Sequence, residues 1–350
     1  MQIIPESVEV VDPEVQDAWR QLAESDVGCL ASSYVLCTVI VGLARAGVAS
    51  RLSASWAPLN SLIPPGAESG LIRHVLRYLE IRGLVESHRD DWRLLPRGAG
   101  LLADLPESLL GYYVEAYGPV LSRMFGQLSG TEKYGVETSR DTEALGRRCE
   151  VLFRSFGTKL IARLVAEHSA RTVVDLGCGT GGLLVDLCGQ HPELKGLGLD
   201  IAADAIGFAQ QRAVQSGLDD RAFFIVADAF QPEAWPSAAV NADFYVMVGA
   251  LHEHFRDGED AVVALLSRYA DLLASPADAA KTLLLAEPEL YHDTADADFY
   301  LIHALSGQGM PRRRESWFKV IDASGLKCRR VFSAPNTGFR FAYYELQADL

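Results

Sequence analysis

The second half of the chain alternates short apolar runs with longer segments of helical period. Five runs have the length and composition of buried strands, and they cover residues 171–176, 195–201, 222–230, 241–251 and 282–287. Helical patterns lie between them, which predicts an α/β fold with parallel strands joined by crossover helices. Residues 312–325 are predicted to form another helix. The last two runs, 327–333 and 338–346, are predicted to form an antiparallel pair that closes the sheet.

The first half of the chain is patterned mainly as helices. Residues 27–49 are apolar and uncharged until Arg45. Such a helix must be buried, either in the chain's own core or in a subunit interface. Residues 70–82 have an amphipathic pattern and precede a predicted hairpin whose turn is Arg89-Asp90-Asp91. A helix followed by a hairpin is typical of winged-helix modules.

The domain boundary is predicted near residue 145. Residues 1–15 have the composition of a loose arm, and residues 142–168 are predicted to form a long amphipathic helix that leads into the first strand. We therefore assign residues 1–145 to a helical domain and residues 146–350 to the α/β domain.

A glycine-rich turn follows the first strand of the α/β domain. Its glycines are Gly177, Gly179, Gly181 and Gly182. Three of them fit the G-x-G-x-x-G pattern of dinucleotide sites, which is weak evidence alone. With Asp175 they also fit D-x-G-x-G-x-G, which resembles motif I of class I S-adenosylmethionine (SAM) methyltransferases. An ordinary tight turn between a strand and a helix is the third interpretation.

Acidic residues at the next two strand ends favour the SAM interpretation. Asp200 ends the second strand, at the spacing that suits a ribose diol. Asp228 ends the third strand, where it would meet the adenine amino group. The predicted cofactor contacts are Asp175, Gly177, Gly179, Gly181, Asp200, Ile201, Asp228, Ala229 and Phe230.

The composition of the chain bears on which partners it binds and in which cellular compartment it acts. The formal net charge is −14, and a nucleic-acid substrate would require a basic face. The six cysteines form no C-x-x-C pair, which favours reduced thiols in the cytoplasm. No apolar run is expected to reach the length of a membrane span, and the first residues lack the pattern of a signal peptide.

The layout as a whole resembles the dimeric, winged-helix small-molecule methyltransferases known as the plant-type O-methyltransferase family. The resemblance rests on LIRHVLRYLEIRGLVE for the helix and wing, on VVDLGCGTGG, GLGLDIA and VADAF for the cofactor motifs, and on LHEHF after the fourth strand. Residues 53–67 differ from the helix-turn-helix sequence that is usual in the family. The resemblance implies a Rossmann-like, seven-stranded sheet whose last pair is antiparallel, a dimerisation domain at 1–145, a homodimer, and a SAM-binding catalytic domain at 146–350.

The resemblance also implies two versions of the chemistry. His252 in LHEHF falls where most relatives have a general base. His303, in FYLIHALSGQGMP, falls with His252 on the metal histidines of the α-keto acid C-methyltransferases of the phenylpyruvate type, and Glu253 falls where that branch has an aspartate. This branch implies a non-haem metal, preferably iron. It also implies methylation of the β-carbon of an α-keto acid for a nonribosomal peptide precursor.

Several alternatives stay open from the sequence. The chain could be a metal-free O- or N-methyltransferase with His252 as its base, or a SAM-binding member of the fold that does not methylate. His254 or His292 could replace either histidine as a metal ligand. The arginine run 312–314 could reach a substrate carboxylate or face solvent. The substrate is a small molecule that is not specified further.

Overall fold

The computed structural model describes residues 12–274, 281–333 and 340–349. The chain folds as two compact units, Met1–Glu115 and Ala116–Leu350. The division lies ahead of the predicted boundary near residue 145, because residues 116–145 pack with the second unit. The roles assigned to the two domains, dimerisation and catalysis, stay predictions.

A seven-stranded sheet forms the centre of the second unit. Its strands lie in the order β6-β5-β4-β7-β8-β10-β9. Their bounds are β4 Thr172–Leu176, β5 Lys195–Asp200, β6 Ala222–Val226, β7 Phe244–Val248, β8 Thr282–Pro288, β9 Leu326–Ser333 and β10 Phe341–Ala348. The first five are parallel, while β10 runs antiparallel to both β8 and β9. The predicted sheet and its closing pair are confirmed.

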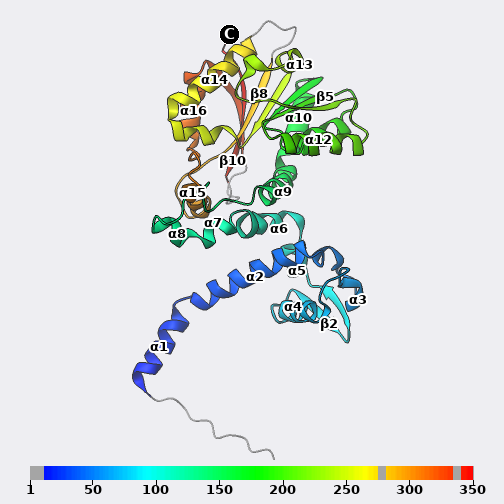
Figure 1. Ribbon diagram of the computed structural model, residues 1–350, viewed down its shortest axis with the longest axis vertical. Coiled ribbons are helices and arrows are strands. Elements are labelled where there is room, and N and C mark those ends of the chain that lie inside the picture. Colours follow the sequence, from blue (N-terminus) through cyan, green and yellow to red (C-terminus); the bar gives the residue numbers. More distant parts are fainter. Residues whose placement is uncertain (1–11, 275–280, 334–339, 350) are drawn as a thin grey trace, which may run out of the picture. The chain divides into compact units, whose positions relative to one another are not determined.

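Helices cover both faces of this sheet. Their bounds, with short turns included, are α7 Gly118–Ser122, α8 Met124–Leu128, α9 Thr142–Phe153, η3 Arg154–Thr158, α10 Lys159–Glu167, α11 Gly182–Gln190, α12 Ala203–Gln215, η4 Pro232–Ala234, α13 Ser237–Val240, η5 Leu251–Asp257, α14 Glu259–Ala274, α15 Ala297–Leu305 and α16 Arg314–Ala323. Figure 1 shows α14 and α16 on one face and α10 and α12 on the other. Each face has its own buried apolar cluster, as expected for a parallel sheet covered on both sides.

The predicted helix 142–168 is interrupted. A π-helical turn, Arg154–Thr158, separates α9 from α10. It contains Gly157, where a Cβ atom would lie 2.2 Å from the ring of Phe153. The ring of Phe153 therefore occupies the space that a side chain at residue 157 would need. The π-helical turn brings this ring against Gly157.

The first unit contains the predicted helix and hairpin. Its elements are α1 Pro13–Glu24, α2 Val27–Arg45, η1 Ala49–Arg51, β1 Ala57–Pro58, α3 Leu59–Leu62, α4 Ser69–Ile81, β2 Val85–His88, β3 Asp91–Leu94, α5 Pro96–Leu101, α6 Asp104–Gly111 and the π-helical turn η2 Tyr112–Ala116, which extends into the second unit. The strands pair in the order β1-β3-β2. Arg89 has φ of 57° in the tight turn of the hairpin. Residues 53–67, whose sequence differs from the family's usual helix-turn-helix, contain the two-residue strand β1 and the one-turn helix α3.

Helix α2 is much less buried than its composition demands. Only Leu36, Ile40, Val41 and Leu43 are buried, and no residue of the preceding α1 is. Among the described residues, α2 is the one helix long and apolar enough to cross a membrane, with 19 residues, a mean hydropathy of 2.0 and 22% of its apolar stretch buried. The expectation that no apolar run has this length was wrong. The finding is weak evidence for a membrane span, because core helices and signal sequences share these properties.

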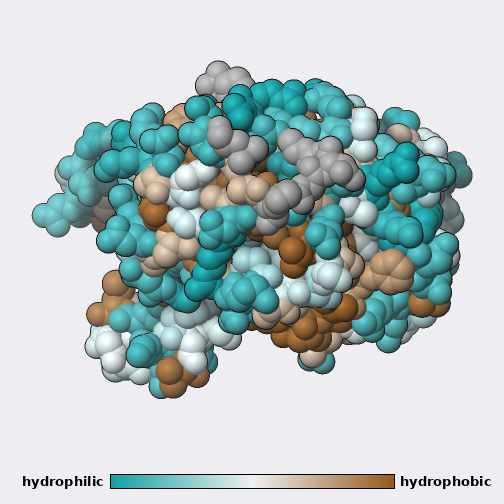
Figure 2. All heavy atoms as spheres, turned by 90° about the horizontal axis from the view of Figure 1, so that it is seen from above, coloured by the Kyte–Doolittle hydropathy of each residue, from teal (hydrophilic) through white to brown (hydrophobic). Residues whose placement is uncertain are grey.

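Polar side chains cover most of the face drawn in Figure 2, and smaller apolar patches interrupt them. The chain has 46 acidic residues against 32 lysines and arginines. A surface with this excess of negative charge repels the phosphate backbone of nucleic acids.

Candidate active site

The glycine turn after β4 has the backbone geometry that only glycine adopts readily. Gly177, Gly179 and Gly181 have φ of 82°, 52° and 75°. At Gly181 a Cβ atom would also lie 2.6 Å from the ring of Phe224, so a larger residue would disturb the packing of the turn on β6. Helix α11 begins at Gly182. The turn thus presents bare backbone at the start of a helix, which suits close approach of a ligand.

Two carboxylates flank this turn. Asp200 accepts hydrogen bonds from the backbone N–H of Gly179 (2.9 Å) and of Ala202 (2.9 Å), so the end of β5 is tied to the glycine turn. Asp175 is 4% exposed. Burial and, next, the negative charge of Asp200 raise the pKa of Asp175 to about 7. The structure therefore brings Asp175, the glycines and Asp200 together, in a site that would be stabilised by a cation.

The third group of predicted cofactor residues follows β6. Asp228 accepts hydrogen bonds from Phe230 N (2.8 Å) and from Gln231 Nε2 (2.7 Å), which fixes its carboxylate on its own loop. Ala229 is buried, while Ile201, after β5, is 74% exposed. A carboxylate has acceptor sites beyond these two bonds. The predicted roles of these residues toward adenine stay predictions.

His252 and Glu287 form a buried pair at the carboxyl edge of the sheet. His252 lies in η5 after β7, and its Nδ1 is 2.7 Å from Glu287 Oε2, at the end of β8. Glu287 is fully buried and also accepts backbone hydrogen bonds from Ala250 (3.1 Å), Leu251 (2.7 Å) and His252 (3.4 Å). A carboxylate on Nδ1 holds the imidazole in the tautomer whose Nε2 accepts a proton. His252 therefore has the geometry of an oriented general base.

His303 lies beside His252. The ring centroids are 5.5 Å apart, although the two residues are 51 apart in sequence (303 − 252). His303 Nδ1 lies 2.8 Å from the carbonyl oxygen of Phe299, one turn earlier in α15. Burial lowers the pKa of His303 to about 4, and the neighbouring His252 and Arg140 add to that effect. His303 is therefore neutral at physiological pH, with its Nε2 directed away from the carbonyl.

The three-ligand metal set predicted from the resemblance does not form. Glu253 is turned toward Gln308 Nε2 (3.3 Å) and Arg140 (3.7 Å) instead. Within the described part of the chain, no group of three or more His, Cys, Asp or Glu side chains could hold a metal ion. The proposed substitutes also have other surroundings, since His254 packs on Phe230 and His292 on Tyr300. The contacts of Glu253 with Gln308 and Arg140 do not support it as a converging ligand, and its role toward a metal stays a prediction.

The arginine run 312–314 is used within the protein. Arg314 binds Glu289 through two nitrogens, at 2.7 and 2.9 Å, and Arg313 donates to the carbonyl of Tyr291 at 2.9 Å. The Arg312 guanidinium lies over the ring of Phe255, 5.1 Å from its centroid. These contacts hold α16 and the preceding turn in place.

The sequence interpretation missed residues on which the site depends. Glu287 was visible as a carboxylate at the end of an otherwise apolar strand. Gly309 packs directly against the backbone of His252 and Glu253. A Cβ atom at Gly309 would lie 2.4 Å from the carbonyl oxygen of His252 and 2.2 Å from that of Glu253, so a larger residue would displace this backbone. Arg140 approaches from the loop before α9, and nothing in its sequence neighbourhood indicated this.

The strand order and the site define the class of protein. The sheet order reverses at β4, and ligands bind α/β sheets at such a switch point, beyond the carboxyl ends of the strands. The glycine turn and the histidines lie at that edge. Residues 173–275 match a family described as "Methyltransferase domain". This part of the chain is a SAM-dependent methyltransferase domain.

Solved structures of known proteins have the same fold over nearly the whole chain. The structure of human N-acetylserotonin methyltransferase in complex with SAM has 16% identity and a TM-score of 0.67, over 97% of this chain and 99% of that one. The mitomycin 7-O-methyltransferase MmcR has 20% identity and a TM-score of 0.63, over 95% and 99%. At these identities the likeness shows the fold alone, and it confirms the predicted Rossmann-like fold of plant-type O-methyltransferases.

Curated relatives match only part of their own length. The 2,7-dihydroxy-5-methyl-1-naphthoate 7-O-methyltransferase of Streptomyces carzinostaticus is 36% identical over 104 residues, which is 29% of this chain and 28% of the relative. The chain spans 24–36% of the length of five such relatives.

Proposed function

We propose that the chain is a SAM-dependent methyltransferase that methylates an oxygen or nitrogen atom of a small natural-product precursor. The observation that carries the proposal is the buried pair of His252 Nδ1 and Glu287 Oε2, 2.7 Å apart, at the sheet edge that also carries the glycine turn. The relative from Streptomyces carzinostaticus acts, by its name, on an oxygen of a hydroxynaphthoate.

The chain's own residues supply the cofactor site and the proton acceptor. SAM provides an electrophilic methyl group on a positively charged sulfur. The glycine turn with Asp175 and Asp200 would hold it. His252 Nε2 would take the proton from the acceptor's O–H or N–H as the new bond to the methyl carbon forms and the bond to sulfur breaks. Glu287 would stabilise the imidazolium until the proton passes to water.

A second candidate is metal-assisted C-methylation of an α-keto acid. The two imidazole rings favour it, because each has an oxygen on its Nδ1, the arrangement that orients metal-binding histidines. A metal ion there would polarise the acceptor's carbonyl group. The absence of a third converging protein ligand in the described residues counts against it.

One experiment separates the two candidates. Purified protein is incubated with SAM and phenols, aromatic amines or α-keto acids, with and without a chelator, and products are located by mass spectrometry and NMR. We expect O- or N-methyl products, unaffected by chelation, and a His303→Ala variant that retains most turnover. A C-methylated keto acid, lost on chelation and in His303→Ala, would instead establish the second candidate.

We also propose that the chain forms a homodimer through its first unit and acts in the cytoplasm. Four apolar residues of α2, Val27, Leu30, Tyr34 and Val35, are 44–74% exposed, and a partner subunit would cover them. All six cysteines are free thiols. Sedimentation should show twice the 38.1 kDa chain mass.

The dimer is tested by charging the exposed face. Leu30→Asp combined with Tyr34→Asp should give a monomer, because burying the new carboxylates in an apolar interface is costly. Phe208→Asp, which changes an apolar residue of α12 that is 62% exposed, should leave the dimer intact. A wild-type chain that sediments only as a monomer at micromolar concentration contradicts the proposal.

A further inference from the structure

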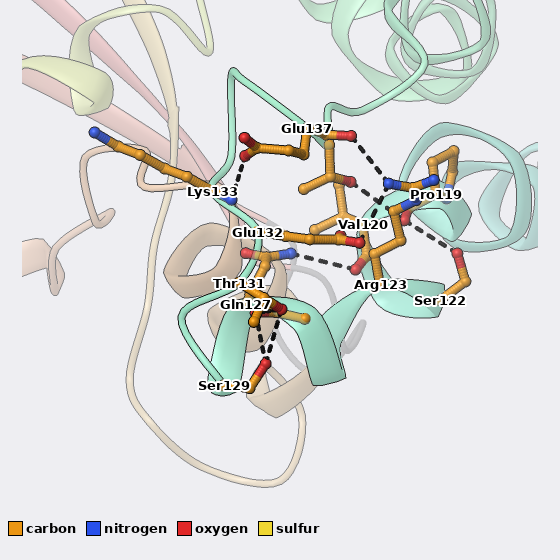
Figure 3. Close-up of polar contacts among 12 residues, drawn as sticks. Pro119, Val120, Ser122, Arg123, Gln127, Ser129, Thr131, Glu132, Lys133 and Glu137 are labelled. Atoms are coloured by element: carbon orange, nitrogen blue, oxygen red, sulfur yellow. Dashed lines mark hydrogen bonds and ion pairs between the residues drawn. The ribbon is translucent and has the colours of Figure 1, made fainter.

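Arg140 is held at a defined position between two anchored segments. Figure 3 shows the loop that precedes it, where Arg123 donates to Glu132 Oε1 (3.3 Å) and to the carbonyl of Glu137 (3.2 Å). On its other side Asp141 caps α9 by accepting from Ala144 N (2.9 Å), and its own N–H donates to the carbonyl of Ala116 (2.9 Å). The backbone at Arg140 is thus tied down on both sides.

The guanidinium of Arg140 lies next to the histidine pair. It is 3.7 Å from Glu253 Oε1, the residue that follows His252, and 3.3 Å from Tyr117 Oη. Its charge also acts on His303. The side chain is 22% exposed, so the charge is largely removed from water at this point.

These contacts leave the guanidinium incompletely paired. Among the described residues, Arg140 makes only the two polar contacts with Tyr117 and Glu253, and both are long. Arg314, in contrast, is paired by shorter bonds: it binds the buried Glu289 at 2.7 and 2.9 Å and Ser333 at 3.0 Å. A guanidinium has five N–H donors, more than the two contacts of Arg140 use, so Arg140 has donors left for a ligand.

We propose that Arg140 binds a carboxylate of the methyl acceptor, so that the acceptor is an anionic small molecule. A planar carboxylate matches the guanidinium fork and would make shorter bonds than Glu253 does. Glu253 would give up its contact with Arg140 and keep its hydrogen bond with Gln308 Nε2 (3.3 Å). The ion pair with Glu253 is therefore a loose internal pair that the acceptor replaces.

The inference rests on the proposed function, because it names the substrate class of the same site. It does not depend on which atom is methylated, since a hydroxy acid, an amino acid and a keto acid all carry the carboxylate. It also assigns carboxylate binding to Arg140 and not to the arginine run 312–314.

The test compares an acid with its neutral amide. Binding of 1-naphthoate and of 1-naphthamide to the full chain, saturated with S-adenosylhomocysteine, is measured by calorimetry. Wild type should prefer the acid by about ten- to a hundredfold, the range of charge-assisted hydrogen bonds. Arg140→Gln should abolish the preference and Arg140→Lys should keep part of it. Glu253→Gln should strengthen acid binding, because it removes the internal competitor.

The control is Arg147→Gln, which removes an exposed arginine of α9 that pairs with Glu143 and should change neither affinity. Equal binding of the two probes to wild type, including no binding of either, overturns the inference. So does a preference that survives Arg140→Gln, or acid binding unchanged in Glu253→Gln. Methyl transfer without a preference for the acid contradicts only this inference. A preference for the acid without methyl transfer to any acceptor contradicts only the proposed function.

Discussion

His252→Ala should lower the turnover number by about 10²–10⁴-fold, the contribution of a positioned general base, and should leave SAM affinity within about twofold. The imidazole is buried against Glu287 beside the strand ends, while the glycine turn and its carboxylates lie on other strands. Turnover is measured as S-adenosylhomocysteine formed with the acceptor found in the panel. Calorimetry gives the affinity for SAM.

Two variants make this result specific. Glu287→Gln keeps the shape of the side chain but removes its charge, so turnover should fall by about 10–10³-fold without loss of SAM binding. His292→Ala removes an exposed histidine that packs on Tyr300 and should leave turnover unchanged. Near-normal turnover in His252→Ala would show that His252 is not the base.

The strands and the cofactor turn were predictable because they depend on local sequence. The run before Gly177 is apolar and β-branched, and its residues are nearly all buried in β4. The glycines and Asp200 occur at spacings that follow from strand ends at one sheet edge. For this reason the hydrogen bond between Gly179 N and Asp200 follows from the predicted arrangement.

The orientation of the side chains around His252 was not predictable in the same way. Glu253 follows His252 directly, yet η5 turns it toward Arg140 and Gln308. That outcome depends on tertiary contacts between segments 55 residues apart (308 − 253). Gly309 makes the same point, since its value comes from backbone packing on residues 252 and 253 that no local pattern reveals.

The affinity for SAM should depend on pH through Asp175. Burial and the charge of Asp200 raise the pKa of Asp175 to about 7 in the ligand-free protein. The carboxylate is therefore mostly protonated at pH 6 and ionised at pH 8. The cationic cofactor favours the ionised form, so binding at low pH must first expel a proton. The dissociation constant should fall by about tenfold between pH 6 and pH 8 and then level off.

The same shift has the opposite sign for the stability of the ligand-free protein. Because the folded state holds the proton more tightly than the unfolded state, Asp175 contributes stability at acidic pH that is lost as pH rises toward 7. Asp175→Asn should therefore be more stable than wild type at pH 8 by denaturant unfolding, while its SAM affinity is weak and independent of pH. Calorimetry in buffers of different ionisation enthalpy should detect protons released by wild type at pH 6.5 and none by the variant. A wild-type affinity constant from pH 6 to 8 would place Asp175 away from the cofactor's charge.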